Sequence, residues 1–338
     1  MVQTGKFVIS IDLELFWGLH HRAEIDRWRQ GLLVARQAVP RVLELFEGYQ
    51  VRATWAALGL LFCRDRDEIL ENLPRRLPAY HAPKISPYAH IAEIGDDEEE
   101  DPWHFGASLL EQICTARGQE IATRTFANFR CLQQGQHGPD FEADLRAALG
   151  IARRWGLLVR SLVFPGGQVR SSYLDICRRM GISAYRGNPP IWPYGPRLAD
   201  ERDHLRRWAR RADAVVPITG TRCVLDDDKK SGTPVNVPAT RRLRNLGALA
   251  GLAAPVQRQR IFAELDCAAR RGGLFHLHWF DRDFGSKPER MLDLLHAILE
   301  RFDGWRRLGR MDSYTMHDVV MGDSDTAHPL MGSNRVVG

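Results

Sequence analysis

The sequence has few lysines and no long apolar segment. Only five of its 47 basic residues are lysines, namely Lys6, Lys84, Lys229, Lys230 and Lys287. The net charge of +5 is spread along the chain and interleaved with acids, so we do not expect nucleic-acid binding. No apolar run approaches the roughly 18 residues of a membrane span, and the N-terminus lacks the layout of a signal peptide. We therefore expect a cytoplasmic protein with no membrane span.

Several chemical motifs are also missing. The six cysteines are scattered without a Cys-x-x-Cys pair, which predicts reduced, buried thiols. The chain has no Gly-x-Ser-x-Gly nucleophile elbow, no Walker loop and no dinucleotide-binding Gly-x-Gly-x-x-Gly after a strand. Two charged clusters remain. Arg206–Arg211 predicts a solvated helix face or a contact with an anionic glycan, and Asp96–Asp101 predicts a surface loop.

Apolar segments alternate with helical patterns along most of the chain, which indicates a mainly parallel sheet. The predicted strands are Phe7–Ile11, Val51–Ala56, Ser161–Phe164, Ala214–Ile218 and Leu274–Trp279. With 338 residues, 44% of them hydrophobic, the chain is long enough for one large domain or two small ones. This pattern alone does not distinguish an open doubly wound sheet from a closed barrel.

Two acids close the first predicted strand. Asp12 and Glu14 are two residues apart, so their side chains project from the same face and can converge on one substrate or ion. Acids directly after the apolar run Phe7–Ile11 are costly to bury unless they have partners or a function. The alternative is structural, with both acids capping a loop or pairing with arginines.

The segment Gly118–Phe129, together with six further segments, resembles the polysaccharide deacetylases (the NodB-homology fold, carbohydrate esterase family four). These six follow the family's order along the chain: Lys6–Gly18, Val51–Leu61, Asp101–Phe105, Ser161–Gln168, Ala184–Asn188 and Leu274–Gly285. The resemblance covers about residues 5 to 320. It implies an α/β fold, a single-domain distorted barrel of about seven strands, with the site at the C-terminal ends of the strands. We expect this domain to span residues 1–322 and the tail 323–338 to be frayed.

The resemblance also implies catalytic roles. In the family, the first acid of the Asp-x-Glu pair is the general base and the second is a metal ligand, which assigns these roles to Asp12 and Glu14. Two histidines four residues apart complete the zinc-type metal site, and here these positions hold Arg124 and Asn128. Arginine cannot lose its proton to bind a metal, and asparagine offers only a weak amide oxygen. We therefore predict that Arg124 pairs with Asp12 or Glu14 in place of the ion.

Two further family positions are substituted. Gly166 replaces the arginine that orients the catalytic acid, and Phe280 replaces the histidine that protonates the leaving amine. Phenylalanine cannot donate a proton. His276 and His278, two apart on the last predicted strand, could rebuild a metal site with the acid pair. The alternative is that both are hydrogen-bonded core residues.

Other residues are candidates for ligand contact. The family segments predict contacts from His104, Arg186 and Asn188. The rings of Trp17, Trp103 and Trp279 could line a sugar-stacking cleft, although large aromatics at strand ends commonly belong to the core.

Two functions follow from these observations. The first is a pseudoenzyme of polysaccharide or cell-envelope metabolism that needs no cofactor and binds a glycan, an amino sugar or a partner protein. The second is an active hydrolase that removes N-acetyl groups through a rebuilt zinc-type site.

Overall fold

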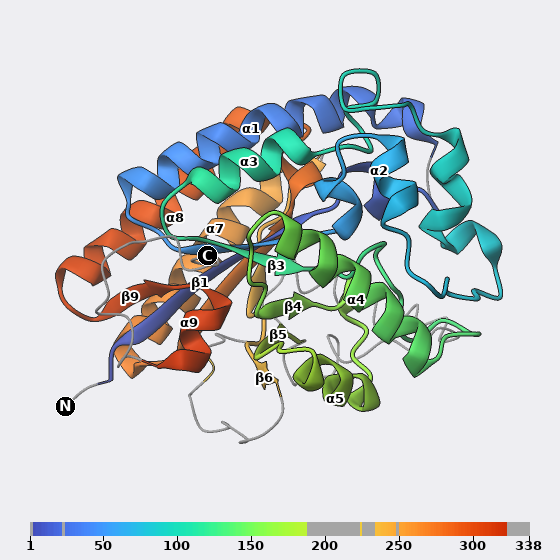
Figure 1. Cartoon of the computed structure of the whole chain (residues 1–338). Coiled ribbons are helices and arrows are strands. Elements are labelled where there is room, and N and C mark those ends of the chain that lie inside the picture. Colours follow the sequence, from blue (N-terminus) through green and yellow to red (C-terminus); the bar gives the residue numbers. More distant parts are fainter. Residues whose placement is uncertain (1–2, 22–23, 188–223, 225–233, 248–249, 323–338) are drawn as a thin grey trace.

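The centre of the molecule is β1 (Gly5–Leu13), a strand of nine buried residues. In this computed structural model, β1 pairs in parallel with β8 (Leu274–Phe280) along one edge (Figure 1). Along its other edge, β9 (Met311–Tyr314) pairs with its first half and β2 (Ala53–Ala57) with its second half. Strands covered on both faces are apolar along most of their length, which explains the run Phe7–Ile11.

The structure describes residues 3–21, 24–187, 224, 234–247 and 250–322. The remaining described strands are β3 (Gln119–Thr123), β4 (Ser161–Val163), β5 (Ala184–Arg186), β6 (Val235–Asn236) and β7 (Arg241–Arg242). They extend one parallel sheet in the order β6-β5-β4-β3-β2-β1-β8-β7. The predicted strand Ala214–Ile218, the cluster Arg206–Arg211 and the tail 323–338 lie outside the described residues.

Long helices pack around the outside of this sheet (Figure 1). Neighbouring members of this outer layer contact one another in the sequence α7–α8–α1–α3, and α4 packs on α5. Their bounds are α1 (Arg29–Gly48), α3 (Ala107–Thr115), α4 (Gly138–Arg154), α5 (Ser171–Arg179), α7 (Ala250–Arg271) and α8 (Pro288–Arg307). The short α2 (Arg66–Glu71) follows β2, and Pro40 lies within α1 without ending it.

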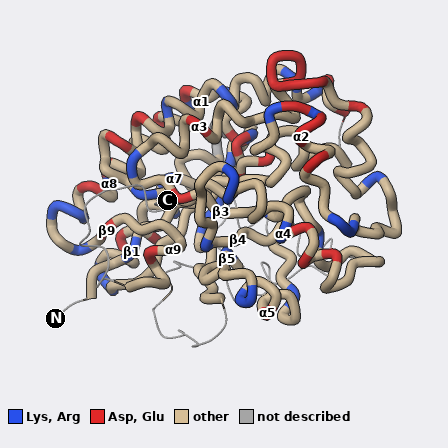
Figure 2. The backbone as a smooth tube through the Cα atoms, in the orientation of Figure 1, with Lys and Arg blue, Asp and Glu red and all other residues tan. Residues whose placement is uncertain are grey.

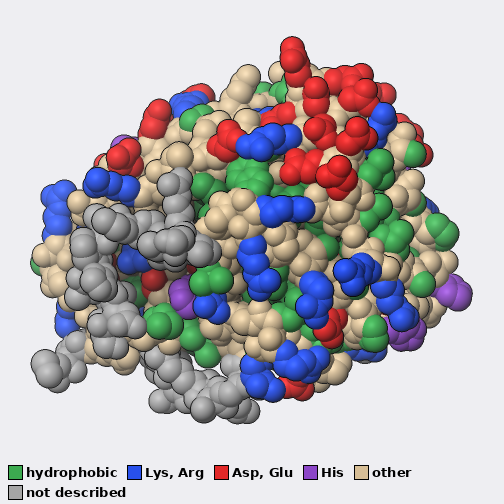
Figure 3. Space-filling view, in the orientation of Figure 1, with side chains coloured by type: hydrophobic (Ala, Val, Ile, Leu, Met, Phe, Trp, Pro, Cys, Tyr) green, Lys and Arg blue, Asp and Glu red, His purple; other side chains and the backbone are tan. Residues whose placement is uncertain are grey.

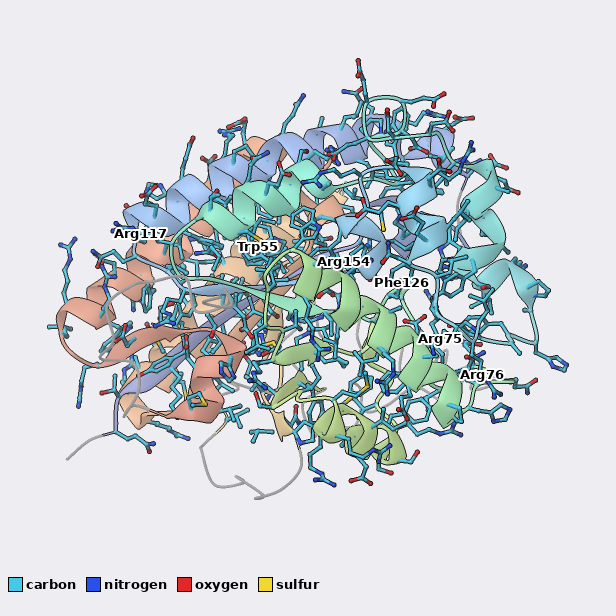
Figure 4. All side chains as sticks on the ribbon, in the orientation of Figure 1. Trp55, Arg75, Arg76, Arg117, Phe126 and Arg154 are labelled. Atoms are coloured by element: carbon cyan, nitrogen blue, oxygen red, sulfur yellow. The ribbon has the colours of Figure 1, made fainter. Side chains whose placement is uncertain are left out.

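Alternation along the strands separates an apolar outer face from a more polar inner face. Trp55 of β2, labelled in Figure 4, lies on the outer face in the core beneath α3, and its indole N–H donates to Gln119. On the inner face, Thr54 donates to Glu120 and accepts from the backbone N–H of Met316. Met316 opens α9 (Met316–Met321), so α9 closes the inner face at the N-terminal end of the strands.

Charged side chains are distributed unevenly over the surface. Asp and Glu gather over the part of the molecule around α2, whereas Lys and Arg are frequent over α4 and α5 (Figures 2 and 3). Many of the surface arginines have acidic neighbours, as in the pair of Arg146 with Glu142 on α4. No described helix is long and apolar enough to cross a membrane.

The fold class predicted from the sequence is confirmed. A parallel sheet curls into a half-barrel with helices outside it, which is an α/β distorted barrel in a single domain. The described residues form nine strands rather than about seven, and β6 and β7 contribute only two residues each. Because the named strands pair with one another in parallel, their C-terminal ends meet at one end of the half-barrel, where Asp12 lies.

Candidate functional site

Polar side chains of β1 point into the half-barrel. The outward residues of β1 belong to the core beneath the helices, while Val8 belongs to the inner cluster near α9. The period of two therefore places Ser10 and Asp12 on the inner face, and Glu14 follows just beyond the strand. The exposed fraction is 0% for Asp12 and 2% for Glu14. Two carboxylates buried to this extent need compensating charge.

Arg124 supplies that charge from the end of β3. Its Nη1 lies 2.9 Å from Asp12 Oδ2, and its Nη2 contacts Glu14 Oε1. The predicted ion pair of Arg124 with the acid pair is therefore confirmed. Burial by itself would raise the pKa of Glu14, but the charges of Arg124 and Arg282 outweigh it and lower the pKa to about 2. Glu14 is thus ionised, and Arg124, a residue that is 1% exposed, bridges it to Asp12.

A second arginine reaches Asp12 from β5. Arg186 Nη2 lies 2.7 Å from the Asp12 carboxylate, and its Nη1 donates to Ser10 Oγ at 2.7 Å. Burial, opposed by Asp12, lowers the pKa of Arg186. Arg186 was predicted to contact substrate, and in this structure its guanidinium binds these two residues of β1.

The hydrogen bonds of Ser10 continue to His276 on β8. His276 Nδ1 lies 3.1 Å from the Val237 carbonyl oxygen, so this nitrogen must carry the proton and donate. Burial and the charge of Arg186 lower the pKa of His276 to about 3, so the ring is neutral and its Nε2 accepts from Ser10 at 2.8 Å. Both ring nitrogens are therefore engaged.

The neighbouring His278 is also engaged by backbone. Its Nδ1 lies 3.1 Å from the Arg241 carbonyl oxygen, and burial with the nearby charge of Arg186 holds its pKa well below 6.5. Within the described part of the chain, no three His, Cys, Asp or Glu side chains come together in a way that could hold a metal ion. The residues present do not fit the zinc-type site that the resemblance implies.

Phe280 is the last inward-facing residue of β8, and three guanidinium groups lie over its ring, that of Arg124 at 5.9 Å from the ring centre. Arg282 lies 4.0 Å from the centre of its ring and Arg242 lies 4.4 Å from it. Both arginines also pair with acids, Arg282 with Glu14 at 2.8 Å and Arg242 with Asp283 at 2.9 Å. The position of the family's general acid therefore holds a ring stacked against cations.

Asp281 fixes the turn that carries Glu14. Its Oδ2 accepts from the backbone N–H groups of Glu14 at 2.9 Å and Leu15 at 2.6 Å, and its Oδ1 accepts from Arg282 N at 2.7 Å. Leu15 has a φ of 47°, a left-handed conformation that such contacts help to hold. Burial, only partly offset by Arg282, raises the pKa of Asp281 to about 6.

The other substituted positions lie in loops. Asn128 is 3% exposed, its φ is 57°, and its Oδ1 has no hydrogen-bond partner. The segment between Arg124 and Asn128 is a bend rather than a helical turn. Gly166 has a φ of 65°, where a residue with a Cβ is strained, so the loop as built disfavours an arginine there.

The predicted aromatic cleft does not form from Trp17 and Trp279. Both rings are almost completely buried in the core, where Trp17 donates to the His104 carbonyl oxygen and Trp279 packs against Phe284. The side chain of His104 is buried too, and its Nδ1 contacts Asp101 Oδ2 at 2.8 Å. Asn188 lies outside the described residues.

Three residues that the sequence did not single out prove central here. Arg242, Arg282 and Asp281 all lie within the site, although none was assigned a role. The only signal in the sequence was the charged run Asp281-Arg-Asp283 directly after a buried strand. Such a run is also typical of an exposed turn, so the sequence alone does not show that these side chains point toward the acid pair.

Comparison with known proteins shows the fold. No family model matches the chain, and no curated protein does. Among solved structures, one assigned as a polysaccharide deacetylase from Mycobacterium smegmatis superposes with a TM-score of 0.53 at 11% identity, covering 92% of this chain and 93% of that one. The fold is that of the polysaccharide deacetylases.

Other proteins share this polysaccharide deacetylase fold. PuuE allantoinase superposes with a TM-score of 0.55 at 10% identity, covering 94% of this chain and 90% of that one. A 4-alpha-glucanotransferase from Thermococcus litoralis gives a TM-score of 0.52 at 10% identity, covering 94% of this chain but 40% of its own. The fold thus occurs with several activities, and the site residues must decide among them.

Proposed function

We propose that the chain is a divergent member of the polysaccharide deacetylase family that has lost metal-dependent hydrolysis and acts by binding a glycan or a partner protein. The bridge from Arg124 to Asp12 and Glu14 carries this proposal. A guanidinium keeps its charge at every physiological pH, so it neutralises the acids without activating a water molecule.

Three chemical steps lack a group to perform them. A deacetylase of this family needs an ion that lowers the pKa of its bound water, and the residues at the site do not fit one. It needs a general base with access to that water, whereas Asp12 is buried between Arg124 and Arg186. It also needs an acid for the leaving amine, and Phe280 cannot supply a proton.

The same site remains suited to binding. Arg242, Arg282 and Phe280 are partly exposed at the end of the strands, next to the sealed acid pair. Guanidinium groups donate several hydrogen bonds in a fixed plane, which suits hydroxyl, carboxylate and amide oxygens of a sugar. Polysaccharide or cell-envelope metabolism in the cytoplasm is the setting that the resemblance suggests for this binding.

The second candidate is an active hydrolase with a rebuilt site. It is supported by the position of His276 and His278 on β8, in register with Val8 and Ser10 of β1. Against it stand the hydrogen bonds that engage His276 on both ring nitrogens and His278 on one. Their lowered pKa values leave both rings neutral, which is the form of histidine that binds a metal.

Two measurements on the purified chain decide between these functions. We expect substoichiometric zinc, cobalt and nickel by elemental analysis after incubation with each metal, and no deacetylation of N-acetylglucosamine oligomers. Binding of the same oligomers, followed by calorimetry, should weaken in Arg242→Ala but not in Arg146→Ala, which removes an exposed pair on α4. Turnover that a chelator abolishes would establish the hydrolase instead.

A further inference from the structure

A groove between α7 and α8 can also take a ligand. It encloses about 620 Å³ and is lined by α7, α8 and the loop that follows β7. Small-molecule sites typically enclose about 300–1,000 Å³. The groove lies outside the half-barrel, and none of the residues that pair with Asp12 or Glu14 line it.

The base of the groove is apolar. The groove is lined by Phe262 of α7, by Met291 and Leu294 of α8, and by Leu246 of the loop before α7. These residues are half-buried except Met291, which is buried. An apolar lining of this size is suited to an alkyl or prenyl chain.

The rim of the groove is basic. Four cationic residues line it, namely Arg244, Arg258, Lys287 and Arg290, and the one carboxylate that lines it is Asp293. Arg258 also stacks 5.6 Å from the centre of the Phe262 ring, which places a guanidinium directly beside the apolar base. An apolar cavity with a surplus of cations at its edge complements a molecule that has an anionic head and an apolar tail.

We propose that the groove between α7 and α8 binds a single-chain amphiphile with a phosphate or carboxylate head. The tail lies on Phe262, Met291 and Leu294, and the head lies among the rim cations. The enclosed volume favours a small molecule over a protein segment, because a stable protein interface covers about 800 Å² on each partner. This proposal does not depend on the function proposed for the acid pair.

A hydrogen bond connects the lining of the groove to the candidate site. Asn245 lines the groove, and its side-chain N–H donates to the Asp283 carbonyl oxygen at 3.2 Å. Asp283 holds Arg242, which stacks on Phe280. A ligand in the groove would therefore lie next to Asn245, which is hydrogen-bonded to the residue that pairs with Arg242.

The test measures the binding of dodecyl phosphate to the full chain by calorimetry, below the critical micelle concentration of this probe. Dodecyl maltoside has the same tail with a neutral head, and inorganic phosphate has the head alone. Two variants alter the groove separately. The double variant Arg258→Gln with Lys287→Gln removes charge where the head is expected, and Ala297→Trp fills space where the tail is expected. Arg64→Gln is the matched control, because Arg64 is an exposed arginine paired with Glu111 away from the groove.

We expect dodecyl phosphate to bind and both comparison probes to bind at least about tenfold more weakly. The double charge variant should weaken dodecyl phosphate binding by about tenfold or more, while Arg64→Gln leaves it unchanged. Ala297→Trp should weaken dodecyl phosphate binding, because the indole would occupy the space of the tail. If the Ala297→Trp protein does not fold, the double charge variant is sufficient as a test. Equal binding of inorganic phosphate, binding only to lipid vesicles, or indifference to both groove variants would overturn the proposal.

Discussion

Gly18 lies against the carboxylate of Glu14 so closely that a Cβ on Gly18 would stand 2.1 Å from Glu14 Oε2. It would also stand 3.0 Å from Arg282 Nη1, the partner of that oxygen. Gly18→Ala should therefore displace the pair of Glu14 with Arg282 and destabilise the fold by about 1–3 kcal/mol. Urea unfolding checks this value.

The control for this variant is Gly150→Ala in α4. A Cβ on Gly150 meets nothing within 4 Å, and alanine favours a helix interior. We expect this variant to be stabilised by roughly 0.5–1 kcal/mol. Equal behaviour of the two variants would show that Gly18 does not constrain Glu14.

Loss of the Arg124 guanidinium should be far more damaging than loss of a surface arginine. Arg124→Ala leaves Asp12 and Glu14 buried with less compensating charge, and removal of one partner from a buried ion pair costs about 3–5 kcal/mol. Arg146→Ala breaks a pair whose arginine side chain is 67% exposed and should cost about 0–1 kcal/mol. Denaturant unfolding at pH 7 measures both, and similar losses would mean that the bridge contributes little.

Acid should destabilise the protein through His276. The pKa of His276 is about 3 in the folded protein against an ordinary value of 6.5, so the unfolded chain binds a proton that the folded chain does not. Stability from this group is complete above pH 6.5 and falls as the pH drops from 6.5 toward 3, by up to about 1.4 kcal/mol per pH unit. Glu14, with its pKa lowered from 4.5 to about 2, adds a further loss below pH 4.5.

The variant His276→Asn separates this contribution. Its amide N–H can replace Nδ1 toward the Val237 carbonyl oxygen, but it does not titrate, so the slope of stability between pH 6.5 and pH 5 should flatten. His296→Asn changes an exposed histidine and should leave the slope unchanged. If the stability of His276→Asn depends on pH as steeply as that of the unaltered protein, His276 is not the source of the slope.

Restoring the two family histidines should restore metal binding before activity. Arg124→His with Asn128→His would place imidazoles beside Glu14, and histidine is among the residues that tolerate the left-handed backbone of Asn128. Zinc binding by calorimetry should appear, while deacetylation stays absent because Phe280 still has no proton to give. Activity in this double variant would show that another group serves as the acid.

The sequence was sufficient for the parts of the molecule that follow local periodicity. The apolar segments Phe7–Ile11 and Leu274–Trp279 predicted the central strands, and the spacing of Asp12 and Glu14 predicted a shared face. Arg124 was placed correctly because a permanent cation next to two buried acids has few stable alternatives. The strands and the shared face needed only local sequence patterns, whereas the position of Arg124 also needed the resemblance to the polysaccharide deacetylases.

The sequence could not give the direction of side chains outside the strands or at long range. Trp17 was a candidate for a cleft, and its burial depends on a hydrogen bond to His104, 87 residues away. Asp281 acts through the backbone of Glu14 and Leu15, across 267 and 266 positions of the chain. Contacts of this kind are set by packing of the whole sheet, which no local pattern records.

Under the proposed function, the guanidinium bridge makes a stepwise return to metal binding costly. A change at Arg124 alone would leave Asp12 and Glu14 buried with only Arg186 and Arg282, among the described residues, as ion-pair partners. Gly166 adds a further obstacle, because its backbone conformation disfavours the arginine found in relatives. Under the proposed function, a single change toward the catalytic residues would therefore cost stability before it could restore hydrolysis, so the bridge favours the persistence of roles other than hydrolysis.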